Sequence, residues 1–193
     1  MRTAVIVVDM LADYFREDHP LPITGPARAI VPAIDRLTAG ARAANQPVIF
    51  ACDSFLEGDF VFRGKMRPHA LRGTPGAEPT ALLTRTRGDI VLPKRRFSAF
   101  FKTDLDQTLR TLGVGGVAVA GITTQVCVLA TALDAVALDF HAVLVEDACA
   151  AHRPDVHAAA LDLYRNTPLH PMLRVQDVDG YLSELDSQGQ GQQ

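Results

Sequence analysis

The sequence predicts a three-layer α/β/α sandwich around a mostly parallel sheet of roughly six strands. Short apolar runs alternate along the chain with segments whose apolar residues recur at helical spacing, as in repeated strand–helix–strand units. The runs are apolar at successive positions, which is typical of strands that helices cover on both faces of a parallel sheet. The length of 193 residues fits a single domain.

The elements follow from these patterns in chain order. Strands are expected at residues 3–9, 46–52, 89–92, 114–121, 141–147 and 173–176, and helices at residues 27–43, 104–112, 124–138 and 155–164. Pro32 interrupts the first helical pattern and suits the first turn of a helix. Gly113 follows the second pattern, where helices commonly end. The folded domain is expected to span residues 1–186, followed by a flexible polar tail over residues 187–193.

Residues 53–79 do not follow this alternation. The segment combines Gly, Pro, Phe and charged residues without a clear period. It directly follows the expected carboxyl end of a strand, which is the edge where open parallel sheets bind ligands. A loop this long inside a compact domain is usually functional, so we expect it to shape a binding pocket.

Composition and charge exclude several functional classes. The formal net charge is −3 and no long basic run occurs, so nucleic acid is not expected as a partner. No apolar run approaches the roughly 18 residues of a membrane span, and the first apolar run is too short for a signal-peptide core. The three cysteines are widely spaced, which does not suit a disulfide framework, so we expect reduced thiols. We therefore expect a cytoplasmic protein without a membrane or nucleic-acid partner.

Polar residues follow three of the expected strands, namely Asp9, Lys94 and Cys127. The carboxyl ends of parallel strands share one sheet edge, so these side chains are expected to lie together. Thr123 or Thr124 can cap the next helix, which puts Cys127 in a first turn where the helix dipole favours a thiolate of lowered pKa. Lys94 would stabilise that thiolate, and Asp9 could move its proton.

Each of these residues also has an ordinary structural interpretation. Cys127 could pack as a small buried hydrophobe. Asp9 could cap a helix or face solvent, and Lys94 could be one of three adjacent surface cations with Arg95 and Arg96. Only the expected arrangement of all three residues at one sheet edge favours a catalytic role over these structural roles.

Several separate motifs in order resemble the isochorismatase-like cysteine hydrolases, a family that includes nicotinamidases, N-carbamoylsarcosine amidohydrolase and isochorismatases. The resemblance extends over residues 3–164. The motifs that carry it are Val7-Val8-Asp9-Met10, His69-Ala70-Leu71-Arg72-Gly73-Thr74, Pro93-Lys94-Arg95-Arg96-Phe97-Ser98-Ala99-Phe100, Gly121-Ile122-Thr123-Thr124-Gln125-Val126-Cys127-Val128, Asp134-Ala135 and Glu146-Asp147-Ala148.

The resemblance implies the isochorismatase-like form of the fold and a catalytic triad at Asp9, Lys94 and Cys127. It also implies a cis peptide bond between Ile122 and Thr123, with the N–H groups of Thr123 and Cys127 holding an oxyanion. In the implied mechanism Asp9 deprotonates Cys127, the thiolate attacks an amide or carbamoyl carbon, ammonia departs, and water hydrolyses the thioester. Family members commonly form homo-oligomers, so a dimer or tetramer is expected.

A metal site is the first point where the sequence departs from some relatives. Nicotinamidases carry an Asp-x-His pair and a second histidine that bind a divalent metal. Asp53 and His69 match this set, but Phe55 stands where the remaining histidine would be, and phenylalanine cannot ligate a metal. We therefore expect that no cofactor is required and leave Zn or Mn at Asp53 and His69 as an alternative. Otherwise His69 is a hydrogen-bonded loop histidine and Asp53 a turn or cap residue.

The substrate pocket is a second departure. Leu11 stands where many relatives have glutamine, which indicates a different substrate. Phe15, Phe55, Phe60 and Phe62 are candidates for an apolar pocket wall, although each could instead belong to the ordinary core.

The leading interpretation is a cysteine amidohydrolase that releases ammonia from a small amide or N-carbamoyl substrate through a thioester on Cys127. Three alternatives stay open: a nicotinamidase proper with a bound metal, an isochorismatase-type vinyl ether hydrolase that needs only acid catalysis, and a non-catalytic binding protein on the same fold.

Overall fold

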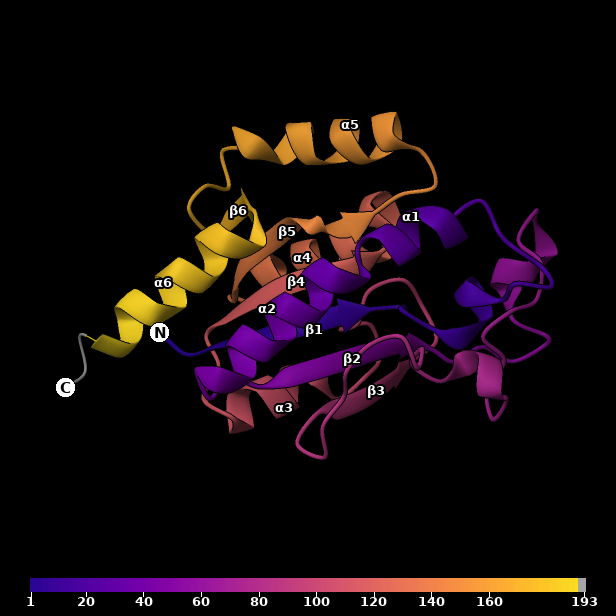
Figure 1. Ribbon diagram of the computed structural model, residues 1–193, viewed down its shortest axis with the longest axis horizontal. Helices are drawn as coiled ribbons and strands as arrows, with labels where there is room; N and C mark the ends of the chain where they lie inside the picture. The colour runs from indigo at the N-terminus through magenta and orange to yellow at the C-terminus, as the bar shows by residue number, and fades with distance from the viewer. Residues whose placement is uncertain (191–193) are drawn as a thin grey trace.

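The computed structural model describes residues 1–190 and shows one six-stranded sheet, all of whose strand pairs are parallel (Figure 1). The order across the sheet is β3-β2-β1-β4-β5-β6. The strands are β1 (Thr3–Val8), β2 (Val48–Asp53), β3 (Ile90–Lys94), β4 (Gly116–Ile122), β5 (His141–Ala150) and β6 (Leu173–Gln176). The expected three-layer fold with a six-stranded parallel sheet is confirmed.

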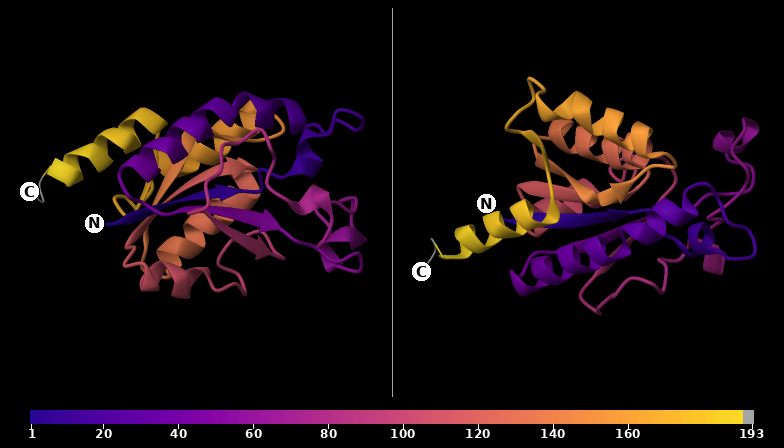
Figure 2. Two further views of the ribbon diagram at one scale, coloured as in Figure 1. Left: turned by 60° about the horizontal axis from the view of Figure 1, so that its bottom comes forward. Right: turned by 45° about the horizontal axis from the view of Figure 1, so that its top comes forward.

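Helices cover both faces of the sheet (Figure 2). One face carries α1 (Thr24–Ala29), α2 (Val31–Ala43) and α6 (Val178–Gln190), and the other carries α3 (Leu105–Thr111), α4 (Leu129–Ala137) and α5 (Pro154–Arg165). Within β1, Val5 and Val7 point into the first core, whereas Ala4, Ile6 and Val8 point into the second. This alternation explains why the strand is apolar at every position.

The helices differ from the expected ones in three places. Residues 27–43 do not form one helix: α1 ends before α2, which carries Pro32 in its first turn. The helix expected at 124–138 begins as a π-helical turn, Thr124–Val128, and continues as α4. Helix α6 was not expected, although Val178, Tyr181 and Leu185 have the spacing of one helix face and are buried against the sheet. This helix includes residues 187–190 of the expected tail, and residues 191–193 lie outside the described part of the chain.

The strand order creates a natural binding position. The chain moves from β1 to one side to form β2 and β3, and returns to the other side of β1 to form β4 and β5. Ligands in open α/β sheets bind at such a switch point, beyond the carboxyl ends of the strands. The long connection from β2 to β3 extends beyond this same edge in Figure 1. Over residues 1–190, no helix has the length and apolar character needed to cross a bilayer.

Gly121 is required where β4 approaches β1. Its φ is +108°, and a Cβ atom there would lie 2.1 Å from the carbonyl oxygen of Val8. We expect Gly121→Ala to lower the free energy of unfolding by about 3 kcal/mol, as measured by urea denaturation. Gly25→Ala is the matched control, because its Cβ would meet nothing within 4 Å and alanine favours helix. Equal urea midpoints for the two variants would contradict the tight approach.

Candidate active site

Asp9 is held in an unusual backbone conformation directly after β1. Its φ of 54° lies in the left-handed region, which aspartate tolerates better than most residues. Its N–H donates to the carbonyl of Ala51, and its own carbonyl accepts from Leu11 N–H, each at 2.9 Å. The turn buries the Asp9 side chain at the carboxyl edge of the sheet.

Lys94 forms a buried ion pair with two carboxylates. Its Nζ lies 2.8 Å from Asp9 Oδ2, 2.6 Å from Asp53 Oδ1 and 3.3 Å from the carbonyl oxygen of Arg96, so each ammonium proton has an acceptor. Burial alone lowers the pKa of Lys94, but Asp9, Cys127 and Asp53 raise it well above its usual value. Lys94 is therefore a permanent positive charge at the base of the site, not a surface cation.

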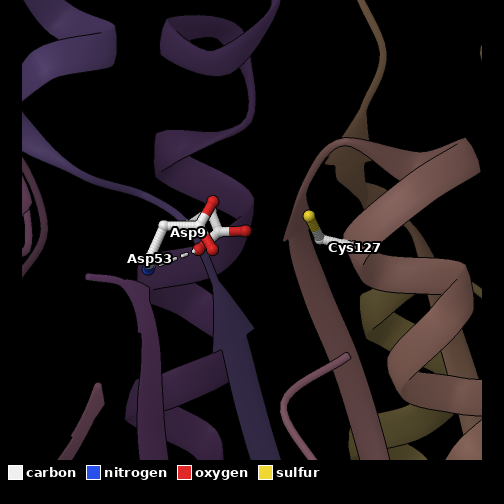
Figure 3. A group of neighbouring side chains, drawn as sticks. All are labelled: Asp9, Asp53 and Cys127. Carbon is white, nitrogen blue, oxygen red and sulfur yellow. Dashed lines mark hydrogen bonds between the residues drawn. The ribbon is translucent and has the colours of Figure 1, made fainter. Parts of the chain in front are cut away.

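Asp53, at the end of β2, belongs to this same cluster. Its backbone N–H donates to Asp9 Oδ1 at 2.9 Å, the contact drawn in Figure 3, while its carboxylate accepts from Lys94. Burial, followed by the charge of Asp9, raises the pKa of Asp53 to about 7. The structure thus places Asp53 among the catalytic candidates rather than in a turn or helix cap.

Cys127 faces the two carboxylates from the other side of the switch point. It lies in the π-helical turn that joins β4 to α4, and Figure 3 shows its sulfur pointing toward Asp9 and Asp53. One donor atom from each of the three residues lies within 4.8 Å of the others. The structure therefore brings together Asp9, Lys94 and Cys127, which the sequence placed at one sheet edge.

The expected lowering of the Cys127 pKa is wrong. Burial, followed by the charge of Asp9, raises the pKa of this thiol well above its usual value, and Lys94 only partly opposes them. The thiol is enclosed in protein and faces two carboxyl groups but one ammonium. A buried environment with this charge balance favours the neutral thiol.

The turn before Cys127 contains the other residues implied by the resemblance. The peptide bond between Ile122 and Thr123 is cis. The Thr123 carbonyl accepts hydrogen bonds from the N–H groups of Val126 and Val128, at 3.0 and 3.3 Å. Ile122, Thr123 and Cys127 all line the same cavity. The use of the Thr123 and Cys127 N–H groups as an oxyanion hole stays a prediction.

That cavity has a volume of about 210 Å³ and a polar base under largely apolar walls. Asp9, Asp53 and Cys127 form the base. The remaining lining residues are Tyr14, Phe55, Met66, His69, Phe97, Ile122, Thr123 and Val126. Such a chamber suits the polar end of a small, flat molecule.

Only Phe55 among the expected pocket residues lines this cavity. Leu11 is fully buried and bridges to Pro79, because the turn at Asp9 directs it into the core. Phe15 is also core, with the Arg28 guanidinium over its ring. Phe60 is 71% exposed on the short turn Phe60–Arg63. Phe62 packs against His69 without lining the cavity. These four assignments are therefore wrong.

Four residues of the cavity wall were not predicted from the sequence. Val126 directly precedes the nucleophile candidate, and Phe97 lies in one of the recognisable motifs, so both carried a usable signal. Tyr14 and Met66 carried none, because their placement depends on how two loops fold over the sheet edge.

His69 is fixed in the cavity wall by its surroundings. Its Nδ1 lies 2.8 Å from the carbonyl oxygen of Arg67. Its ring packs against Tyr14, Phe55 and Phe62 with centroid distances of 5.4, 5.5 and 5.8 Å. These contacts leave Nε2 as the ring nitrogen for a ligand.

The residues present do not fit a metal bound by Asp53 and His69. Among the described residues, the group of close donor atoms is Asp9, Asp53 and Cys127, without His69. Both carboxylates of that group already bind the Lys94 ammonium, which supplies the positive charge a metal would bring. Phe55 occupies the position of the third expected ligand, a histidine in nicotinamidases, and its ring packs edge-on against His69.

Replacement of Asp53 by asparagine is expected to change how stability depends on pH. A carboxyl group whose pKa is raised on folding contributes stability below its unfolded pKa of about 4, and this contribution is lost as pH rises toward 7. As pH rises from about 4 to 8, the free energy of unfolding of Asp53→Asn should therefore increase on the order of 2–4 kcal/mol relative to that of wild type. Urea denaturation across this range measures the difference. A parallel pH dependence of the two proteins would contradict the raised pKa.

Comparisons with known proteins agree with this geometry. A family model described as the isochorismatase domain matches residues 3–177. A protein of Arabidopsis thaliana described as a probable inactive nicotinamidase is 34% identical over 81% of this chain and 85% of its own length.

Two solved structures have the same fold over nearly the whole chain. An N-carbamoylsarcosine amidase from Thermoplasma acidophilum aligns with a TM-score of 0.80 and 29% identity, over 93% of this chain and 98% of that one. A pyrazinamidase of Pyrococcus horikoshii, solved in complex with zinc, aligns with a TM-score of 0.79 and 27% identity, over 92% and 99% of the two chains.

Proposed function

Because the chain belongs to the isochorismatase family of hydrolases, we propose that it is a cysteine hydrolase that cleaves the C–N bond of a small amide or N-carbamoyl compound and releases ammonia. The observation that carries this proposal is the enclosed thiol of Cys127 facing Asp9, which Lys94 holds in place. The related amidase and pyrazinamidase support the same bond type. A vinyl ether hydrolysis would need an acid but no thiol.

The first step moves a proton from Cys127 to Asp9 as sulfur attacks the carbonyl carbon. Burial raises the pKa of the thiol, so a standing thiolate is not the starting species. Asp9 accepts the proton while the new C–S bond forms and the carbonyl π electrons move to oxygen. Lys94 and the Asp53 N–H each hold one Asp9 oxygen, which orients this base toward the sulfur.

The second step expels ammonia. The N–H groups of Thr123 and Cys127 hold the oxyanion of the tetrahedral intermediate. Asp9 returns the proton to the leaving nitrogen, the C–N bond breaks, and a thioester remains on Cys127. Water then adds to the thioester carbonyl and gives its proton to Asp9, which returns it to the departing sulfur as the acid product leaves.

The experiment that tests the proposal detects the thioester. Nicotinamide, pyrazinamide and N-carbamoylsarcosine are incubated with the protein, ammonia is measured, and quenched samples are examined by intact and peptide mass spectrometry. We expect ammonia release with an acyl adduct on Cys127 that hydroxylamine intercepts. Ammonia release with no interceptable adduct, or an adduct only on the buried Cys52 or Cys149, would contradict the mechanism.

The expected homo-oligomer and cytoplasmic location stay predictions. Sedimentation velocity of the purified protein would test the first.

A further inference from the structure

The turn that carries Cys127 is held by two side chains that lie outside it. This turn has π-helical form over Thr124–Val128 and joins β4 to α4. Thr131 contacts the carbonyl of Cys127, and His157 contacts the side chain of Thr124. Neither Thr131 nor His157 lines the catalytic cavity, so each can influence Cys127 only through these contacts.

Thr124 depends on His157 for its hydrogen bond. It is the first residue of the turn and is 1% exposed. Its Oγ1 lies 2.8 Å from Nδ1 of His157, which belongs to α5. Among the described residues, this hydroxyl has no other hydrogen-bond partner. A buried hydroxyl without a partner is unfavourable, so loss of His157 would favour a different conformation at the start of the turn.

Thr131 holds the later part of the turn from within the site. It is fully buried in α4, and its hydroxyl donates to the Cys127 carbonyl at 2.7 Å. The same hydroxyl accepts the N–H of Ala99 at 3.0 Å, in the segment that follows Lys94. The contact from His157 differs, because it brings in α5, a helix that contributes no residue to the cavity.

Helix α5 is a firm support for this contact. His157 lies three and four residues before Ala160 and Leu161, which are buried, so the three side chains share one face of the helix. Leu161 belongs to the second core, and α5 packs against both β5 and the turn. At the end of the helix Arg165 pairs with Glu146 of β5. The position of His157 is therefore fixed by the packing of the whole helix.

The contact does not depend on one protonation state of His157. Burial lowers the pKa of this ring below its ordinary value; Glu146 opposes the effect and Arg165 adds to it. The ring is therefore mainly neutral at about pH 7. The Thr124 hydroxyl can donate to Nδ1 or accept from it, so the hydrogen bond forms with either tautomer and also with the protonated ring.

We propose, resting on the amidohydrolase function above, that His157 is a positioning residue for Cys127 and acts through its hydrogen bond to Thr124. The N–H groups proposed to hold the oxyanion, those of Thr123 and Cys127, lie on either side of Thr124 in the chain. A shift of this turn would misalign both the sulfur with Asp9 and these N–H groups with the oxyanion. The chemical step would slow, whereas substrate binding would change little.

A pair of substitutions at His157 tests this in the full-length protein. His157→Leu removes the polar contact, whereas His157→Asn keeps a polar atom near the place of Nδ1. With nicotinamide, pyrazinamide and N-carbamoylsarcosine as substrates, we expect His157→Leu to lower kcat roughly 10- to 100-fold and to leave KM within about threefold. His157→Asn should retain most of kcat. Leucine is the better helix former, so a purely structural role of α5 predicts the opposite order.

Substitution at Thr124 tests the same bond from its other end. Thr124→Val should lower kcat by a similar factor, and the variant that combines it with His157→Leu should be no slower, because both changes remove one interaction. If His157→Leu does not fold, as judged by circular dichroism, kcat of Thr124→Val decides.

His141→Leu is the matched control. His141 is an exposed histidine at the amino end of β5, at the sheet edge opposite the site, and this variant should keep the kcat of wild type. Three results would each overturn the proposal: wild-type kcat in His157→Leu or Thr124→Val, an asparagine variant as slow as the leucine variant, or effects at His157 and Thr124 that multiply.

Alkylation of Cys127 by iodoacetamide separates this proposal from the function on which it rests. The reaction needs a thiol aligned with its base but no amide hydrolysis, and peptide mass spectrometry measures its rate. We expect His157→Leu to slow it and His157→Asn to preserve it. That result without ammonia release from any substrate would support the positioning role and overturn the hydrolase. Equal alkylation rates in wild type and His157→Leu would overturn the positioning role, and ammonia release by wild type would then still support the hydrolase.

Discussion

Replacement of Cys127 by alanine is expected to lower kcat for amide hydrolysis by at least about 10⁴-fold. Asp9, Lys94 and the turn at Thr123 would all remain, but the thiol that forms the proposed thioester would be gone. Ammonia release under saturating substrate measures the effect. The fold should persist, since the Cys127 side chain borders the cavity and its removal enlarges that cavity by one sulfur atom.

The matched controls are Cys52→Ala and Cys149→Ala. Both thiols are free and buried, and their Sγ atoms lie near backbone carbonyls of the sheet. These variants should lose some stability through small cavities and keep kcat within a few-fold of wild type. Activity of Cys127→Ala close to wild type would assign the reaction to acid catalysis, in which Asp9 would be the reacting group.

Replacement of Lys94 by methionine is expected to lower the free energy of unfolding by about 3–5 kcal/mol at pH 8. Methionine fills a similar volume, but Asp9 and Asp53 would lose the ammonium that lies 2.8 and 2.6 Å from them. Two buried carboxylates would then face each other without a counter-charge. Hydrolysis should fall with stability, since Asp9 would no longer be oriented toward Cys127.

The pH dependence of this variant distinguishes an electrostatic loss from a packing loss. Without Lys94, the pKa of Asp53, already about 7, rises further. The folded variant therefore binds protons that the unfolded chain releases, and its deficit should be small near pH 4 and grow toward pH 8. Urea denaturation at both ends of this range measures it, with the exposed Lys102→Met as control. A deficit independent of pH would indicate lost packing.

The layered architecture and the convergence of Asp9, Lys94 and Cys127 at one sheet edge could both be predicted from the sequence. Runs such as residues 3–8, apolar at every position, can be buried only between two layers of helices, which implies a parallel sheet. In such a sheet the carboxyl ends of the strands meet at one edge, so Asp9, Lys94 and Cys127 had to converge once the strands were located. Hydrophobic periodicity is a local property that the sequence displays directly, whereas the strand order came from the structure.

The surroundings of these groups could not be predicted from the sequence. Asp53 proved to be a partner of Lys94, and the thiol of Cys127 proved to have a raised pKa. Phe55 entered the cavity wall, whereas Leu11 and Phe15 joined the core. Burial, charge balance and the path of a long loop depend on contacts between residues far apart in the chain. Their energies arise only when the layers pack, so no local pattern in the sequence encodes them.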